Sequence, residues 1–136
     1  MTGVQTCALP ILWLAENPEF TPGSGQPSHY GYEFGLPLGK AILSLTIYGV
    51  GEDGERSDYW YSITWWDVAT ETIRLHNWGV NGVANVTGTI TLTDTGDETE
   101  LEGVDWGGDP RRFKDTTNWS GNEDRKSTRL NSSHRL

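Results

Sequence analysis

Residues 86–93 alternate between an apolar or small residue and a threonine at every position. Successive side chains of a β-strand point to opposite faces of a sheet, so this pattern predicts a strand with one buried and one solvated face. We expect Ile90 and Leu92 on the buried face. Residues 43–48 repeat the pattern, with Leu43, Leu45 and Ile47 on one side. The 3.6-residue period of an amphipathic helix does not appear, which indicates an all-β fold.

Turn-forming residues divide the chain into short segments. The predicted strands are Ser28–Gly35, Ala41–Val50, Asp58–Asp67, Thr72–Gly79, Val83–Thr93 and Glu98–Trp106, with a short stub at Thr116–Trp119. Asn81-Gly82 predicts a type I′ hairpin, because both residues tolerate positive φ. The links are too short for parallel crossovers, so the fold class is an antiparallel up-and-down meander. Arg111, Arg112 and Lys114 are expected in a solvated loop.

A closed barrel needs about eight strands, and six strands with a stub are too few. An open sheet also leaves two edges that favour aggregation. We therefore expect a partial or incomplete β-barrel over residues 28–123, preceded by an irregular segment at 12–27, where Pro18–Pro27 carries three prolines and two glycines.

The two ends of the chain are related through the genetic code. Read on the complementary strand, the codons of Ile11 back to Met1 can encode Asp124 to His134, which gives eleven consecutive in-frame pairs. The end peptides also look like translated sequencing adapter. We therefore expect residues 1–11 and 124–136 to be adapter-derived, and the natural protein to extend beyond both ends. Such segments are set aside before the fold is considered.

Charge and composition limit the partners. The 136 residues carry ten Lys or Arg against nineteen Asp or Glu, a net charge of −9. This acidic balance disfavours nucleic acid as a partner. A single Cys excludes an internal disulfide and a thiolate metal cluster, and no apolar run approaches the roughly 18 residues that span a bilayer. We expect no metal, no membrane partner and, without a native secretion signal, a cytoplasmic location.

Aromatic residues are abundant, with seven Trp and five Tyr. In the segment Asp58–Asp67 both predicted faces are aromatic. Strict alternation places Tyr59, Tyr61, Ile63 and Trp65 on one face, and Trp60 and Trp66 on the other. In the next segment Arg74, His76 and Trp78 share a face.

These patterns predict four ligand-binding residues, because large aromatic side chains line sites for apolar or planar ligands. They are Tyr61, Trp65, His76 and Trp78. A solvated strand face with a partly covering Trp explains His76 more simply than a cavity residue does. No catalytic residue is assigned, because no nucleophile elbow, phosphate-binding glycine loop or second metal-ligating residue accompanies His76.

The run Tyr48–Leu92 contains an aromatic strand ending in Trp66-Asp67, a strand ending in Trp78-Gly79, then Asn81-Gly82 and a strand with Gly88-Thr89. In these features it resembles the small calycin-like β-barrels, the lipocalin-like and nitrobindin-like group that includes many bacterial proteins. The resemblance covers about a third of the chain. It implies a barrel that holds hydrophobic molecules or haem. No motif matches the haem-ligating His of that group, so no cofactor is expected.

Three functions remain open. The first is a non-enzymatic barrel that binds a small apolar or planar molecule. The second is a carbohydrate-binding or accessory β-sandwich module, which predicts that Trp60 and Trp66 lie exposed in a row. The third is a barrel enzyme that uses His76.

Overall fold

The structure is a computed structural model that describes residues 11–120 and 124–128. Most of both predicted adapter segments, 1–11 and 124–136, lies outside these residues. The elements are β1 (Ile11–Glu16), β2 (His29–Gly35), the short turn α1 (Pro37–Lys40), β3 (Ile42–Val50), β4 (Arg56–Asp67), β5 (Thr72–Gly79), β6 (Asn85–Leu92), β7 (Gly96–Val104), β8 (Pro110–Ser120) and β9 (Asp124–Thr128).

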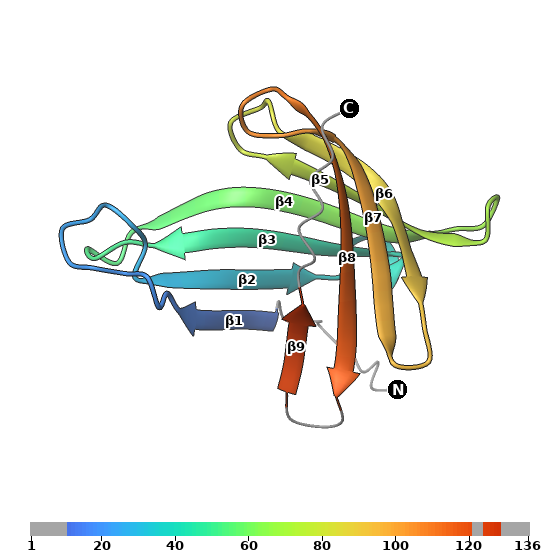
Figure 1. The fold of residues 1–136 in the computed structure, drawn as a ribbon, viewed down its shortest axis with the longest axis horizontal. Helices are drawn as coiled ribbons and strands as arrows, with labels where there is room; N and C mark the ends of the chain where they lie inside the picture. The colour runs from blue at the N-terminus through green and yellow to red at the C-terminus, as the bar shows by residue number, and fades with distance from the viewer. Residues whose placement is uncertain (1–10, 121–123, 129–136) are drawn as a thin grey trace, which may run out of the picture.

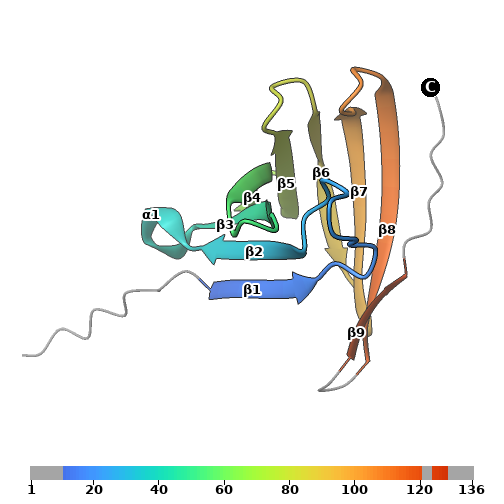
Figure 2. The same cartoon turned by 90° about the vertical axis from the view of Figure 1, so that its left-hand side faces the viewer.

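The described strands form one antiparallel sheet of nine strands, whose spatial order follows the sequence from β1 to β9. The predicted all-β, up-and-down meander is therefore confirmed. β1 and β9 lie at the two edges and do not pair with each other, so the sheet is open and consistent with a partial barrel. Figures 1 and 2 show its strong curvature, with β6–β8 crossing the direction of β2–β4 at a steep angle.

The predicted irregular segment 12–27 is wrong in its first part. Residues 11–16 form β1, which pairs with β2 along its whole length, from Ile11 opposite Phe34 to Glu16 opposite His29. Pairing with β2 satisfies backbone groups that would otherwise remain open at that edge, and this favours a strand. Residues 17–28 are irregular as expected, and the Asn17 side chain fastens them by donating to the Pro27 carbonyl at 2.8 Å.

The predicted solvated loop at 111–114 is also wrong, because these residues belong to the long strand β8, which extends the predicted strand stub at 116–119 toward the N-terminus. Its basic side chains lie opposite the acidic ones of β7. Arg112 pairs with Glu102 at 3.0 Å, and Lys114 lies 3.4 Å from both Glu98 and Glu100. Cross-strand pairs of opposite charge favour this register of the two strands.

The two faces of the sheet differ, and register assigns residues to each. Leu45, Ser62, Asn77 and Val86 lie directly opposite one another across β3 to β6, and we call their side the inner face. On this face Trp60 contacts Trp106 of the β7–β8 loop, with ring centroids 5.0 Å apart. β4 and that loop are separated by two intervening strands, so they meet across the concave side. The other side is the outer face.

Few side chains are buried in this single layer. Among the described residues, the buried apolar ones are Tyr48, Ala84 and Val86. The expected burial of Leu92 is wrong, because it is 60% exposed, whereas Ile90 is half-buried. Leu92 is the last residue of β6 and Leu43 is the second residue of β3, at the same end of the sheet, and both lie exposed. Alternation correctly gives the face of Leu92, but burial also depends on what covers that face.

On the outer face, Tyr48 lies flat over Gly31, its directly paired neighbour on β2. The Arg56 guanidinium lies 3.9 Å above the Tyr48 ring and is held by Glu33 at 2.6 Å and Asp58 at 2.7 Å. These two carboxylates raise the pKa of Arg56, with the Asp58 hydrogen bond as the larger cause. An aromatic ring over a strand glycine covers backbone that would otherwise be exposed.

Candidate functional site

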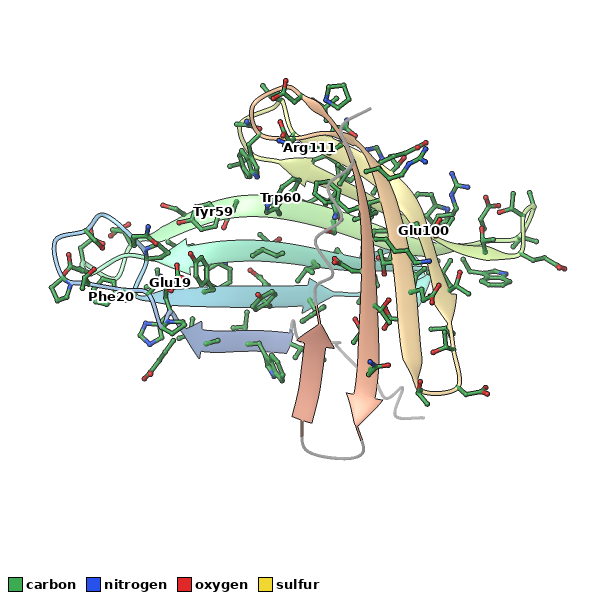
Figure 3. The ribbon with its side chains drawn as sticks, viewed as in Figure 1. Glu19, Phe20, Tyr59, Trp60, Glu100 and Arg111 are labelled. Atoms are coloured by element: carbon green, nitrogen blue, oxygen red, sulfur yellow. The ribbon has the colours of Figure 1, made fainter. Side chains whose placement is uncertain are left out.

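An aromatic pocket of about 580 Å³ opens on the inner face near the β7–β8 loop. β2, β3, β4 and that loop supply its lining, which consists of Tyr30, Tyr32, Ile47, Tyr59, Trp60 and Trp106. Figure 3 shows Tyr59 and Trp60 side by side along β4. Five of the six lining residues are aromatic, which is the typical composition of a site for small organic molecules.

A β-bulge in β4 places two consecutive rings in this pocket. Ile47 pairs with Trp60 and Tyr48 pairs with Asp58, so Tyr59 is an extra residue in the strand. A bulge of this kind breaks the alternation of side chains. The prediction that Tyr59 and Trp60 lie on opposite faces is therefore wrong, because both line the pocket.

Gly49 leaves space for the Tyr59 ring. A Cβ atom at position 49 would lie 2.5 Å from the Tyr59 hydroxyl and 2.9 Å from Pro27 Cβ. The Tyr59 ring also packs against Tyr30, with centroids 6.4 Å apart and planes tilted by 60°. Because Gly49 has no side chain, the Tyr59 ring can take this position and form one wall of the pocket.

Asp105 organises the loop that carries Trp106. One carboxylate oxygen accepts the amide hydrogens of Gly107 at 2.9 Å and Asp109 at 3.0 Å, and the other accepts the Arg111 guanidinium at 2.6 Å. These hydrogen bonds, with Arg111 as the largest cause, lower the pKa of Asp105. The Trp106 ring is therefore held over Trp60 by a charged and well-bonded turn.

A second loop supports Trp106 from the side. Asn81 Oδ1 accepts the amide hydrogens of Val83 at 3.0 Å and Ala84 at 3.1 Å, and its Nδ2 donates to the Trp106 carbonyl at 3.2 Å. The predicted type I′ turn is wrong, because only Gly82 has positive φ there. The Asn81 side chain bonds its own loop instead, a known alternative for Asn in turns.

Acidification is expected to release the Trp106 loop only at low pH. Folding lowers the pKa of Asp105 below the ordinary carboxyl pKa of 3.8. The charged Asp105 side chain therefore contributes its full stabilisation above pH 3.8, and this stabilisation is lost as the pH falls through the lower pKa of the folded state. In Asp105→Asn the anion is absent at every pH. We expect the Gly107 amide and Trp106 indole NMR signals to move in this variant at pH 7, and in the natural chain only below about pH 4.

The control for this prediction is Asp94→Asn, at an exposed carboxylate in the β6–β7 turn. It should leave both signals in place. Unchanged signals in Asp105→Asn at pH 7 would contradict the role given to Asp105.

The predicted ligand-binding residues lie on the outer face and do not line the aromatic pocket. Tyr61 pairs with Trp78, and their rings stack at 6.3 Å, while the His76 and Trp78 rings stack at 3.7 Å. His76 Nε2 is hydrogen-bonded to Asn85 Oδ1 at 2.7 Å. Trp65 lies further along the same face, opposite Arg74. The sequence thus grouped these residues correctly on one face, and their role in binding stays a prediction.

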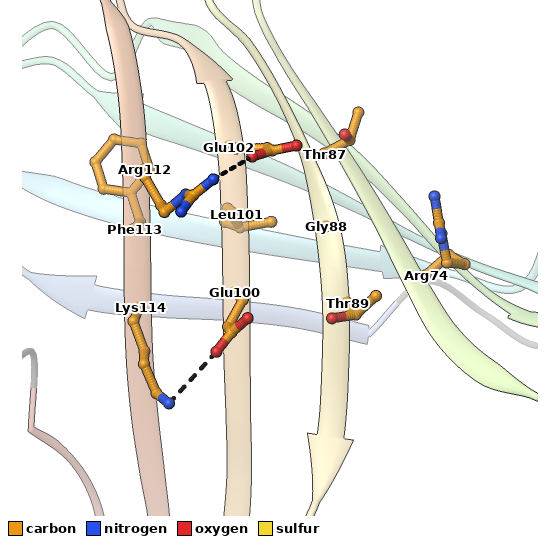
Figure 4. Close-up of a pocket in the computed structure, with 10 residues that line it drawn as sticks. All are labelled: Arg74, Thr87, Gly88, Thr89, Glu100, Leu101, Glu102, Arg112, Phe113 and Lys114. Atoms are coloured by element: carbon orange, nitrogen blue, oxygen red, sulfur yellow. Dashed lines mark hydrogen bonds and ion pairs between the residues drawn. The ribbon is translucent and has the colours of Figure 1, made fainter. Parts of the chain in front are cut away.

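A charged groove of about 560 Å³ lies over β5–β8 (Figure 4). Its ion pairs join Glu102 to Arg112 and Glu100 to Lys114. Hydrogen bonding to Glu100, then to Glu98, raises the pKa of Lys114. These side chains are about half or more exposed, and such surface pairs contribute little stability. Because the carboxylates are already paired with cations, the groove has no free acid pair for chemistry.

Within residues 11–120 and 124–128, no group of three or more His, Cys, Asp or Glu side chains could hold a metal ion. No helix in the same residues has the length and apolar character needed to cross a membrane. Comparison of the chain with protein-family models, curated proteins and solved structures gives no match.

Proposed function

We propose that this protein is a non-enzymatic, barrel-like binding protein that holds a small apolar or planar organic molecule in the aromatic pocket. The observation that carries the proposal is the meeting of five aromatic side chains around one cavity of about 580 Å³. Large aromatic surfaces supply binding energy through burial of apolar area, and this volume falls in the range of small-molecule sites.

The open antiparallel meander is compatible with the calycin-like group, and we include that identity in the proposal. The net charge of −9 supports a small molecule rather than nucleic acid as the partner. The cytoplasmic location stays a prediction from the sequence.

The carbohydrate-binding alternative requires a row of exposed tryptophans. Trp60 is half-buried beneath Trp106, whereas Trp66 is 56% exposed. They lie six positions apart along β4, which is about 20 Å of strand length. The two rings therefore do not form a continuous platform, and this favours the aromatic pocket as the binding site.

The enzyme alternative depends on His76. Its described hydrogen-bond partner is the Asn85 amide, and its ring lies flat on Trp78. Among the described residues, no carboxylate is hydrogen-bonded to His76. This arrangement supports a packed surface histidine better than a general base.

Binding can be tested with a panel of fatty acids, flavins and porphyrins. We expect at least one class to bind the full chain and Trp60→Leu to weaken that binding at least about ten-fold, or 1.4 kcal/mol, because it removes the central ring of the pocket. Isothermal titration calorimetry is the suitable measurement, since loss of a tryptophan would itself change a fluorescence signal.

The matched control is Trp66→Leu, on the same strand and the same face but outside the pocket lining. It should bind as the natural chain does. Absence of binding by every class would contradict an apolar or planar ligand, and equal losses in the two variants would contradict the aromatic pocket as its site.

A further inference from the structure

The ring planes of the aromatic pocket stand at steep angles to one another. Trp60 and Trp106 meet at 78°, and Tyr30 and Tyr59 at 60°. A flat ligand gains most from parallel rings, whereas steeply inclined rings can present their faces to a rounded group from several sides. Aromatic faces carry partial negative charge, and they attract cations placed within about 6 Å of the ring centre.

The charges around the pocket favour a positive ligand. None of the six lining side chains carries a formal charge. The guanidinium that follows the Trp106 loop, Arg111, is neutralised by Asp105 at 2.6 Å. The whole chain carries a net charge of −9, which raises the local concentration of cations around it.

The same lining distinguishes between kinds of cation. A primary ammonium holds its water strongly and needs hydrogen-bond acceptors or a carboxylate when it is buried. No carboxylate lines the pocket. A quaternary ammonium donates no hydrogen bond and presents apolar methyl groups. Its transfer from water to the aromatic pocket therefore costs less free energy than the transfer of a primary ammonium.

We propose that the ligand of the aromatic pocket carries a quaternary ammonium group, which contacts the faces of the inclined rings. This inference rests on the proposed function in that the pocket holds a small organic molecule, and it replaces an apolar or planar molecule with one that carries a rounded cationic group.

The test compares three small probes that share a hydroxyethyl group, by calorimetry on the full chain. They are choline, its neutral carbon isostere 3,3-dimethylbutan-1-ol, and ethanolamine, which carries a primary ammonium. We expect choline to bind at least ten-fold tighter than either of the others. Trp60→Leu should weaken choline binding at least ten-fold, Trp60→Phe should weaken it less because a ring face remains, and Trp66→Leu should leave it unchanged.

Each other outcome overturns the inference in a distinguishable way. If the neutral isostere binds equally or more tightly, the pocket binds apolar groups, so the proposed function stands and the inferred quaternary ammonium is wrong. The same two conclusions follow if only fatty acids, flavins or porphyrins bind. Choline binding that is equal in Trp60→Leu and disappears in 0.5 M NaCl is surface attraction alone. If no probe and no panel member binds, the proposed function fails as well.

Discussion

Replacing Gly88 with alanine is expected to lower the free energy of unfolding by about 3 kcal/mol or more, at or above the upper end of overpacking effects. A Cβ atom at this position would overlap the Glu100 carbonyl oxygen, and it would lie 2.7 Å from the Glu100 carbonyl carbon and 2.9 Å from Leu101 Cα. These are backbone atoms of the paired strand β7 and cannot rotate away. The β6–β7 pairing must therefore open locally.

Urea unfolding followed by circular dichroism measures this effect. The control is Gly107→Ala, where the nearest atom to the new Cβ is Asp105 Oδ1 at 3.4 Å and the amide hydrogen bond is kept. That change should stay within about 0.5 kcal/mol of the natural chain. Equal midpoints for the two variants would contradict the packing described for β6 and β7.

Gly31→Ala is expected to destabilise the fold by about 2–3 kcal/mol, because the new methyl group occupies the place of the Tyr48 ring. The Cβ would lie 2.5 Å from the Tyr48 hydroxyl and closer still to the ring carbons. Displacement of this buried ring also breaks its contact with the Arg56 guanidinium. The loss thus combines packing with a cation–π contact.

A double-mutant cycle with Tyr48→Ala identifies the cause. If the ring is the obstacle, Gly31→Ala should cost much less once the ring is gone, giving a coupling energy of about 1–2 kcal/mol between the two positions. Strictly additive effects would show that the glycine is required for another reason.

Alternation and short links together predicted the fold class, because β6 and β3 follow the two-residue period and the links allow no parallel crossover. It gave the wrong faces where a bulge intervenes. Nothing in the residues around Tyr59 distinguishes an extra residue from a regular one, since the pairing with β3 creates the bulge. Turn chemistry located the Asn81-Gly82 connection correctly, but not its type, because the Asn81 side chain also bonds Trp106 in a distant loop.

The candidate site could be predicted only in part. Register brings Tyr61, His76 and Trp78 together, as their spacing on β4 and β5 predicted. The sequence could not show which face is concave, because both faces of β4 carry aromatic residues. It also missed Trp106, which reaches the pocket through the Asp105 turn rather than along a strand. The available signal for that turn was the sequence Asp-Trp-Gly-Gly-Asp at residues 105–109.

The extra residue at Tyr59 has a consequence for how such a protein could diversify. Deleting one residue there would restore regular pairing, with Asp58 still opposite Tyr48 and Trp60 still opposite Ile47, and would remove only the extra ring. A related chain could therefore gain or lose an aromatic wall by a single-codon insertion or deletion, with every other side chain unchanged. Length variation in this strand, more than substitution, would then separate relatives with different ligands.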